Sequence, residues 1–388
     1  MKAKFICHPD FENEKPINVF HKQVEKVDIP IGEPEFSNRH ILFRKKVSLS
    51  DIKDAAFRIS ADDYYKLYIN GRFVTQGPAP SYPQHYYYNE IDVSEYLQNG
   101  ENVFAVHTYY QGLINRVWVS ADHRQMLWCS LNVNGETMLV SDESWLCANH
   151  SGYTACGRSP VSTFYLECYD SSSSEENFFL PDYDDSLWNN AAIYKNADYA
   201  LEKQPTPQLY FETIYPKTVE RFDGGIRVDF GREAVGYIHL VAKGDKGDSV
   251  TVRCGEELKE DGSVRYKMRC DAVYEDKWIL SGNTDTFRPF DYKAFRYVQL
   301  IVPDGVTIKE IAFVIRYMPF EQKATYTTDN EKLKKVIDLC VDTIKYGTQE
   351  VFIDCPTREK LGWTNDAQGT AEQMLTNFKI EKLFEKWH

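Results

Sequence analysis

Hydrophobic and polar residues alternate in short runs along the first part of the chain. Residues 57–61 and 65–69 follow this two-residue period, which is typical of half-buried β-strands. The dipeptides Asn70–Gly71 and Asn134–Gly135 stand between such runs and favour two-residue hairpin turns. Short strands joined by tight turns over residues 38–170 predict an antiparallel sandwich or jelly roll.

A second block with the same period follows a segment that contains several prolines. Pro205, Pro207 and Pro216 lie within residues 201–216, which we interpret as a linker because proline cannot donate a sheet hydrogen bond. The runs beyond it are rich in Val, Ile, Phe and Tyr and cover residues 226–230, 236–241, 249–253, 295–302 and 311–315. They predict a second β-sandwich over residues 217–320.

The hydrophobic period changes after this block. Thr328, with Glu331 three residues later, fits a capping box at the start of a helix. Apolar residues then recur with the spacing of one helix face at Leu333, Val336, Ile337, Cys340, Val341 and Ile344. Further helices are expected near residues 366–375 and 380–387. The sequence therefore predicts a mainly β, multidomain protein whose last part is helical.

Composition and charge restrict the classes of partner. Hydrophobic residues make up 43% of the 388 residues, enough for two or three buried cores. Aromatic residues make up 14%, which favours β structure and also suits contact with sugar rings. The net charge of −13 argues against a nucleic acid or an anionic membrane surface as partner. A neutral substrate is compatible with this charge.

Cysteine usage and the absence of targeting patterns bear on the compartment. Nine cysteines are scattered without the spacing of a zinc site, and their number is odd. The first ten residues contain no signal-peptide pattern, and no apolar run of about 18 residues predicts a membrane span. We therefore expect reduced thiols, a cytoplasmic protein, and no metal or other cofactor.

The stretch that is most informative about function lies near the C-terminal end, where residues 354–366 read DCPTREKLGWTND. It contains three carboxylates, one guanidinium and one indole, those of Asp354, Glu359, Asp366, Arg358 and Trp363. Carboxylates bind hydroxyls and transfer protons, arginine fixes a carboxylate, and an indole offers a face to a sugar ring. The groups indicate a sugar site, and the alternative is a loop of solvated charges.

This stretch resembles the motif of bacterial α-L-rhamnosidases of glycoside hydrolase family seventy-eight. In that motif Asp-Cys-Pro-x-Arg and one or two acidic residues precede Leu-Gly-Trp-Thr-Gly-Asp-Ala. Weaker likenesses occur upstream in the expected order, at residues 68–71, 182–188, 255–262 and 287–298. The resemblance covers the chain from about residue 38 to its end.

The resemblance implies a particular order of domains. Residues 1–200 would form an N-terminal, galactose-binding-like jelly roll, and residues 217–320 a second β-sandwich. Residues 321–388 would then form the first helices of an (α/α)6 catalytic barrel, truncated here because twelve helices need on the order of 200 residues.

The resemblance also implies a reaction and a role for each motif residue. The reaction is an inverting hydrolysis that releases terminal α-L-rhamnose from a rhamnose-containing glycoside or oligosaccharide. Glu359 corresponds to the general acid, and Asp354, Arg358, Trp363 and Asp366 correspond to sugar-binding residues. The general base comes from further downstream in the family, so we expect little hydrolysis by these 388 residues alone. A homodimer of this chain is a further expectation.

Two positions differ from the family pattern. Glu359 is a single acidic residue where many relatives have two, and Asn365 replaces the usual glycine. If that position requires a positive φ, asparagine tolerates it better than most residues.

Two other classes of function stay open. The β-sandwiches could bind glycans without catalysis, or the chain could be a scaffold with a degenerate site. Candidate sugar platforms, which would otherwise be core rings, are Tyr82, Tyr86, Tyr87, Tyr88, Tyr109 and Tyr110. Trp363 could likewise be a core residue, and Glu359 could pair with Arg358 or Lys360.

Overall fold

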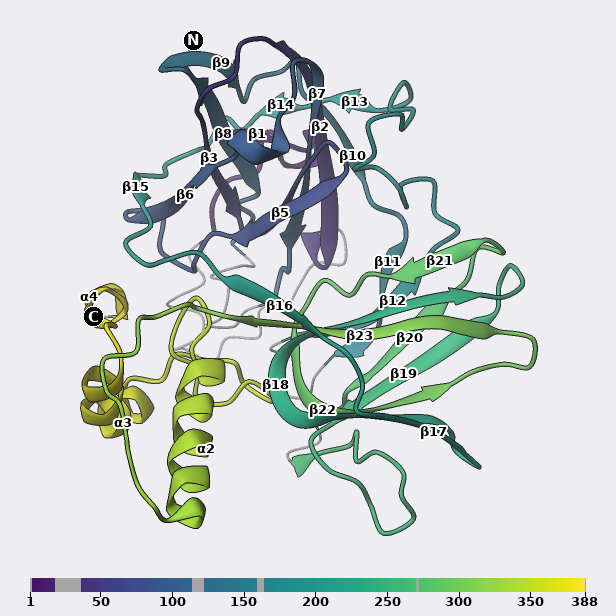
Figure 1. Ribbon diagram of the computed structural model, residues 1–388. Coiled ribbons are helices and arrows are strands. Elements are labelled where there is room, and N and C mark those ends of the chain that lie inside the picture. The colour runs from purple at the N-terminus through teal and green to yellow at the C-terminus, as the bar shows by residue number, and fades with distance from the viewer. Residues whose placement is uncertain (1, 18–35, 114–121, 159–163, 270–271, 388) are drawn as a thin grey trace. The chain divides into compact units, whose positions relative to one another are not determined.

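The chain divides into two compact units (Figure 1). Unit 1 comprises Met1–Ser151 and Ser174–Gln204, and unit 2 comprises Gly152–Ser173 and Pro205–His388. The computed structural model describes residues 2–17, 36–113, 122–158, 164–269 and 272–387.

Unit 1 is built from two sheets. The first has the strand order β14-β1-β8-β3-β6-β15, with β9 beside β8, and the second has the order β13-β10-β2-β7-β4-β5. The strands of the first sheet are β1 (Ile6–Cys7), β3 (Ala55–Asp62), β6 (Tyr86–Asp92), β8 (Met126–Val133), β9 (Glu136–Val140), β14 (Ala192–Ile193) and β15 (Leu201–Lys203). Those of the second are β2 (Arg39–Leu49), β4 (Tyr64–Ile69), β5 (Arg72–Gly77), β7 (Gly100–Tyr110), β10 (Leu146–Asn149) and β13 (Asn189–Asn190). Short 3₁₀ helices are η1 (Pro9–Phe11) and η3 (Ser94–Tyr96).

The alternating residues of both sheets face one shared core. Phe57 of β3 and Phe104 of β7 are fully buried, and their ring centroids lie 5.0 Å apart. The predicted turn at Asn70–Gly71 has φ values of 51° and 82°, as a two-residue hairpin of this type requires. The predicted mainly β fold is therefore confirmed, and in unit 1 the strand alternation produces a sandwich.

A pair of buried carboxyl groups follows β3. Tyr199 Oη donates to Asp62 Oδ2 at 2.7 Å, and the backbone N–H of Gln111 donates to Asp63 Oδ2 at 2.8 Å. Burial, with Asp122 nearby, raises the pKa of Asp62 to about 7. Burial and the charge of Asp62 hold the pKa of Asp63 well above its usual range. Burial thus favours the protonated form of both carboxyls.

We expect Asp63→Asn to stabilise the protein more at pH 8 than at pH 5. Both carboxyls have a higher pKa when folded than the value of about 4 in an unfolded chain. Their contribution to stability is therefore fully present only below about pH 4, and it is lost as the pH rises through the folded pKa, which is about 7 for Asp62. Asparagine at position 63 has nearly the same shape and carries no charge at any pH. Urea unfolding at both pH values measures the effect, with exposed Asp54→Asn as control, and an equal pH response in both variants would contradict it.

Unit 2 contains one large sheet with the order β11-β12-β20-β19-β22-β18-β23-β16, and both β17 and β21 also pair with β18. Its strands are β11 (Tyr153–Arg158), β12 (Tyr165–Asp170), β16 (Tyr210–Ile214), β17 (Thr218–Phe222), β18 (Gly225–Lys243), β19 (Ser249–Gly255), β20 (Glu275–Ile279), β21 (Thr284–Phe287), β22 (Lys293–Ile301) and β23 (Thr307–Tyr317).

The domain boundaries differ from the expected ones at two places. Residues 152–173 lie in unit 2, because β12 pairs in parallel with β20, so the expected domain over 1–200 is interrupted. The expected linker over 201–216 contains β15 and β16, which pair with β6 and β23. A proline removes the backbone hydrogen-bond donor only at its own position. The residues before and between these prolines can therefore still join a sheet.

The long strand β18 organises unit 2. Sequence periodicity predicts separate strands at 226–230 and 236–241, whereas the structure joins them in β18 with a register shift between Asp229 and Ala234. Its first half pairs with β17 and β22, and its second half pairs with β21 and β23. The sheet folds back on itself, because Phe295 of β22 stacks on Phe313 of β23 with 3.9 Å between ring centroids.

Three helices lie side by side at one edge of unit 2 in the described residues (Figure 1). They are α2 (Glu331–Gly347), α3 (Thr364–Asn377) and α4 (Glu381–Trp387). The predicted cap of the first helix is wrong by two residues. Asn330 Oδ1 accepts from the backbone N–H of Lys332 and Leu333 at 3.1 Å, whereas Thr328 Oγ1 accepts from Asn330 itself. Asparagine caps at least as well as threonine and lies nearer the helix.

The predicted apolar face of α2 is covered only in its second half. Val341 and Ile344 pack against a cluster that includes Met318, Phe352, Phe378 and Leu383. At the other end of the face, the side chains of Leu333 and Val336 remain 47% and 50% exposed.

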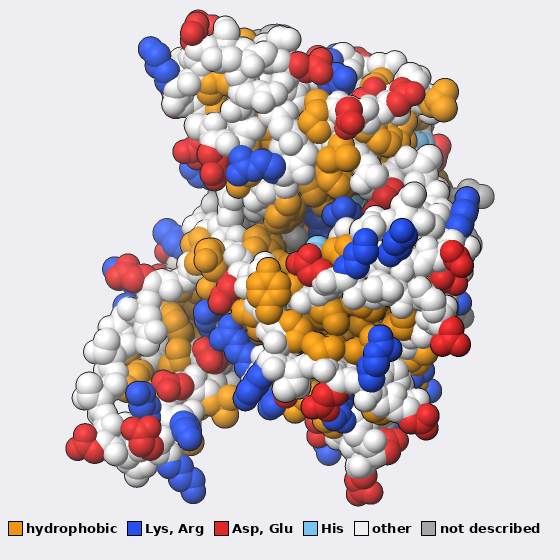
Figure 2. All heavy atoms as spheres, turned by 45° about the vertical axis from the view of Figure 1, so that its right-hand side comes forward, with side chains coloured by type: hydrophobic (Ala, Val, Ile, Leu, Met, Phe, Trp, Pro, Cys, Tyr) orange, Lys and Arg blue, Asp and Glu red, His pale blue; other side chains and the backbone are white. Residues whose placement is uncertain are grey.

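The charged residues of the surface are mixed in sign. Figure 2 shows acidic and basic side chains interspersed over the visible face, without a broad basic field.

Candidate active site

Residues 354–363 of the motif lie on the loop between α2 and α3, and residues 364–366 begin α3. The beginning of this loop is fixed to the sheet. Arg316 of β23 is fully buried, and its Nε donates to Gln349 Oε1 at 2.8 Å. The same guanidinium pairs with Glu350 and donates to Tyr237 Oη at 2.8 Å. The chain that leaves α2 is therefore held by a buried, hydrogen-bonded cation.

The end of the loop is fixed by a second buried cation. Lys360 Nζ lies 2.7 Å from Asp291 Oδ2 and 2.6 Å from the carbonyl oxygen of Tyr292, and it also contacts the rings of Phe164 and Tyr292. Burial lowers the pKa of Lys360, although Asp291 opposes this effect. The backbone of Lys360 has a φ of 57°, a conformation that costs a non-glycine residue about 1 kcal/mol. The buried contacts offset this strain.

Glu359 lies between an arginine and an indole. Its Oε1 is 2.7 Å from Arg358 Nη2, and its Oε2 accepts a 2.8 Å hydrogen bond from Trp363 Nε1. The side chain of Glu359 is 21% exposed, and Trp363 is 37% exposed. The alternative that Glu359 pairs with Arg358 is therefore observed, but Trp363 is not a core residue.

The remaining motif residues are only partly brought together. Asp354 Oδ1 accepts from the backbone N–H of Leu361 at 3.0 Å, and Asp354 Oδ2 lies 4.0 Å from Arg358 Nη2. Asp366 lies in the first turn of α3 and is exposed. Within the described part of the chain, no hydrogen bond or ion pair joins Asp366 to the other four residues.

The local backbone shows whether position 365 needs a positive φ. Asn365 lies within α3 and has no positive φ, so replacement of the family's glycine needs no special conformation there. The positive φ occurs instead at Lys360, one residue after the single acid.

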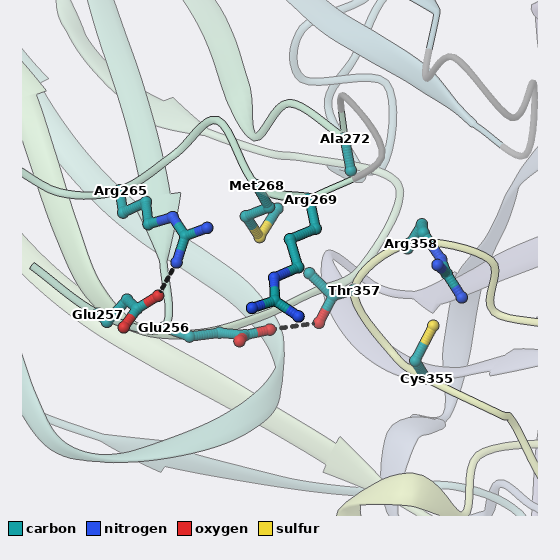
Figure 3. A pocket seen from close by; sticks show the side chains of 9 residues that line it. All are labelled: Glu256, Glu257, Arg265, Met268, Arg269, Ala272, Cys355, Thr357 and Arg358. Atoms are coloured by element: carbon teal, nitrogen blue, oxygen red, sulfur yellow. Dashed lines mark hydrogen bonds and ion pairs between the residues drawn. The ribbon is translucent and has the colours of Figure 1, made fainter.

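A cavity of about 350 Å³ lies beside the loop (Figure 3). Cys355, Thr357 and Arg358 form its wall on the loop side, and residues between 256 and 272 form the opposite wall. Thr357 Oγ1 donates to Glu256 Oε1 at 2.5 Å and connects the two walls.

Sequence reasoning missed the two cations that hold the loop. The sequence suggests Lys360 only as a partner of Glu359, whereas it pairs with Asp291, 69 residues upstream. Arg316 directly follows the predicted strand over 311–315. A charge at the end of such a run of buried residues is a useful sign of a buried ion pair.

Three of the six candidate sugar platforms in unit 1 are core rings. Tyr86, Tyr109 and Tyr110 are 4%, 6% and 1% exposed, whereas Tyr82 is 59% exposed. The three buried rings therefore cannot offer a face to a sugar.

Other features of the described residues bear on the remaining expectations. No three His, Cys, Asp or Glu side chains in this part of the chain gather in a way that could hold a metal ion. The eight cysteines in the same residues are free thiols. None of the helices seen there has the length and apolar content needed to cross a membrane.

Comparison with family models finds three matches in chain order. Residues 50–211 match the alpha-L-rhamnosidase N-terminal domain, and residues 221–313 match the bacterial alpha-L-rhamnosidase concanavalin-like domain. Residues 321–388 match the bacterial alpha-L-rhamnosidase 6 hairpin glycosidase domain.

Individual relatives agree with these matches. An alpha-L-rhamnosidase of Formosa agariphila is 24% identical over 369 residues, which cover 89% of this chain and 39% of the relative. The structure of an alpha-L-rhamnosidase from Dictyoglumus thermophilum superposes with a TM-score of 0.78 at 25% identity, covering 99% of this chain and 43% of that one. A rhamnosidase of Bacillus sp. GL1 has a TM-score of 0.84 at 14% identity, covering 100% and 62%, and supports the fold alone.

The chain contains β-sheet modules followed by helices. A loop between two of these helices carries a carboxylate, an arginine and an indole, and this organisation is that of a modular glycosidase. The three family matches and the relatives make the assignment specific: the chain belongs to the bacterial alpha-L-rhamnosidase family. It spans about 39% of the length of the Formosa relative.

Proposed function

We propose that this chain belongs to an enzyme that hydrolyses terminal α-L-rhamnosides with inversion, and that Glu359 is the general acid. The observation that carries the proposal is the position of its carboxyl group between Arg358 and Trp363, 21% exposed and on a loop fixed at both ends. A carboxyl group held in this way can reach a glycosidic oxygen without leaving its binding partners.

Arg358 would position this acid. Its Nη2 lies 2.7 Å from Glu359 Oε1 and 4.0 Å from Asp354 Oδ2, so one guanidinium faces two carboxylates of the proposed site.

The other motif residues would bind the sugar. Asp354 Oδ1 accepts from the loop backbone, and Oδ2, which accepts from the thiol of Cys355 at 3.1 Å, has a further lone pair for a sugar hydroxyl. The exposed indole of Trp363 offers an apolar surface to the methyl group of a 6-deoxy sugar. Asp366 would join the site only when a substrate bridges it to the loop.

The inverting mechanism needs a second carboxylate about 6.5–9.5 Å from the first to activate water. The resemblance places this base in later hairpins of the helical domain than the three helices described here. We therefore expect the 388 residues alone to hydrolyse an aryl α-L-rhamnoside slowly or not at all, as measured by release of the phenol. Rapid turnover by these residues would contradict this expectation.

The stereochemistry of the product tests the mechanism. Proton NMR of an α-L-rhamnoside digest by the full product of the gene should show β-L-rhamnose as the first sugar formed, before mutarotation. Appearance of α-L-rhamnose first would rule out single displacement, and no release of rhamnose would overturn the proposed function.

A further inference from the structure

We propose that Cys355 is a positioning residue for the reaction, because its thiol joins the carboxylate of Asp354 to the backbone of Glu359. This inference rests on the proposed function and adds a residue that acts through two others. Cys355 Sγ donates to Asp354 Oδ2 at 3.1 Å, and the backbone N–H of Glu359 donates to Cys355 Sγ at 3.5 Å. One sulfur atom therefore contacts both the proposed sugar-binding carboxylate and the residue that carries the proposed acid.

The thiol lies just inside the base of a closed loop. The backbone N–H of Asp354 donates to the carbonyl oxygen of Leu361 at 2.8 Å, and the backbone N–H of Leu361 donates to Asp354 Oδ1 at 3.0 Å. The backbone N–H of Lys360 then donates to the carbonyl oxygen of Cys355 at 3.1 Å. The contact between the sulfur and the N–H of Glu359 continues this series by one residue, and it is the contact that reaches the acid.

The backbone that carries the thiol is itself fixed. Pro356 follows Cys355, and a residue that precedes proline is restricted to extended conformations. Tyr274 Oη donates to the carbonyl oxygen of Pro356 at 3.1 Å, and Thr357 Oγ1 donates to Glu256 Oε1 at 2.5 Å. The sulfur is thus held by its own side of the loop, so it can hold the opposite side, where Glu359 lies.

The state of the thiol suits a bridge rather than a reactive group. Burial raises the pKa of the Cys355 thiol, so the group keeps its proton near neutral pH. A protonated thiol can donate to a carboxylate and accept from an N–H at the same time, whereas a thiolate could not donate. It is also a poor nucleophile, because the thiolate is the reactive form.

Removal of the sulfur should loosen the acid without unfolding the loop. Cys355 is half-buried and lines the cavity of about 350 Å³, so Cys355→Ala opens no sealed void. The hydrogen bonds between Asp354 and Leu361 at the base of the loop do not involve the thiol. Glu359 would lose one backbone contact and keep those of its side chain with Arg358 and Trp363.

Kinetics of the full gene product with two leaving groups tests this inference. The probes are methyl α-L-rhamnoside, which has a poor leaving group, and p-nitrophenyl α-L-rhamnoside. We expect Cys355→Ala to lower kcat about 10- to 100-fold on the methyl glycoside, as for a reacting group that is slightly displaced. On the aryl glycoside the loss should be less than about threefold, because that leaving group needs less protonation.

A double variant shows whether the thiol acts through the acid. Cys355→Ala combined with Glu359→Gln should be about as slow on methyl α-L-rhamnoside as Glu359→Gln alone, since a lost acid cannot be displaced further. Cys156→Ala removes an exposed thiol in β11 and is the matched control, with kcat expected to stay within about twofold of wild type.

Serine at the same position provides a second variant. It keeps a donor and an acceptor on a shorter bond, so kcat of Cys355→Ser should lie between those of wild type and Cys355→Ala. Thermal unfolding should show a Tm within about 4 °C of wild type for both variants. If Cys355→Ala does not fold, Cys355→Ser decides: a larger loss on the methyl than on the aryl glycoside supports the inference, and equal losses overturn it.

The outcomes separate the two proposals. If Glu359→Gln is slow but Cys355→Ala is fully active, the inference is overturned and the proposed function stands. Additive losses in the double variant, or an equal loss of kcat on both substrates, overturn the inference as well, because the thiol would then act on the fold or on sugar binding. Full activity of Glu359→Gln overturns the proposed acid and, with it, the inference.

Discussion

Glu359→Gln should lower kcat by about two to four orders of magnitude on a rhamnoside with a poor leaving group. Glutamine has nearly the same shape, and its amide oxygen can still accept from Trp363 Nε1, but it cannot deliver a proton. The loss should be smaller with p-nitrophenolate, which needs less protonation on departure. Steady-state kinetics of the full gene product with both substrates measures the difference.

A matched control separates chemistry from charge. Glu372→Gln removes an exposed carboxylate in α3 and should leave kcat within twofold of wild type, as expected for a surface change remote from chemistry. If Glu359→Gln retains full activity on both substrates, Glu359 is not the acid. An equal loss on both substrates would point to binding rather than proton transfer.

Lys360→Met should destabilise the 388-residue chain by about 3–5 kcal/mol. The substitution removes a buried ammonium group and leaves Asp291 and the carbonyl oxygen of Tyr292 without their partner. Urea unfolding followed by tryptophan fluorescence measures this change. The structural reason is the burial of the pair: the side chains of Lys360 and Asp291 are 1% and 13% exposed.

A surface lysine provides the comparison. Lys379 pairs with Glu321 at 2.6 Å, but the two side chains are 55% and 66% exposed, so Lys379→Met should cost at most about 1 kcal/mol. Similar losses for the two lysines would contradict the role of Lys360. The double variant Lys360→Met with Asp291→Asn should be less destabilised than the sum of the single variants, because it leaves no unpaired charge.

The sequence predicted those elements whose conformation depends on neighbouring residues. Alternation marked β3 and β4, the two positive φ values of Asn70 and Gly71 followed from the dipeptide, and the helix positions near the end followed from period. The motif was also found from the sequence, because its residues are contiguous in the chain, although the contacts that hold its loop are not.

The features that the sequence did not reveal depend on pairings between distant residues. Residues 165–170 alternate like any strand, and nothing in them indicates that they pair in parallel with β20, more than 100 residues later. The ion pair of Lys360 has the same character, since its partner lies 69 residues upstream. The cap at Asn330 was missed for a local reason, because two good capping residues compete within three positions.

The two cations that hold the motif loop make contacts between different modules of the family. Arg316 and Asp291 lie outside residues 321–388, which match the six-hairpin domain, and so does Phe164, whose ring contacts Lys360. A helical module expressed by itself, or joined to a foreign sandwich, would therefore lose these supports of the motif loop. Exchange of modules between such enzymes should preserve these three positions together with the loop.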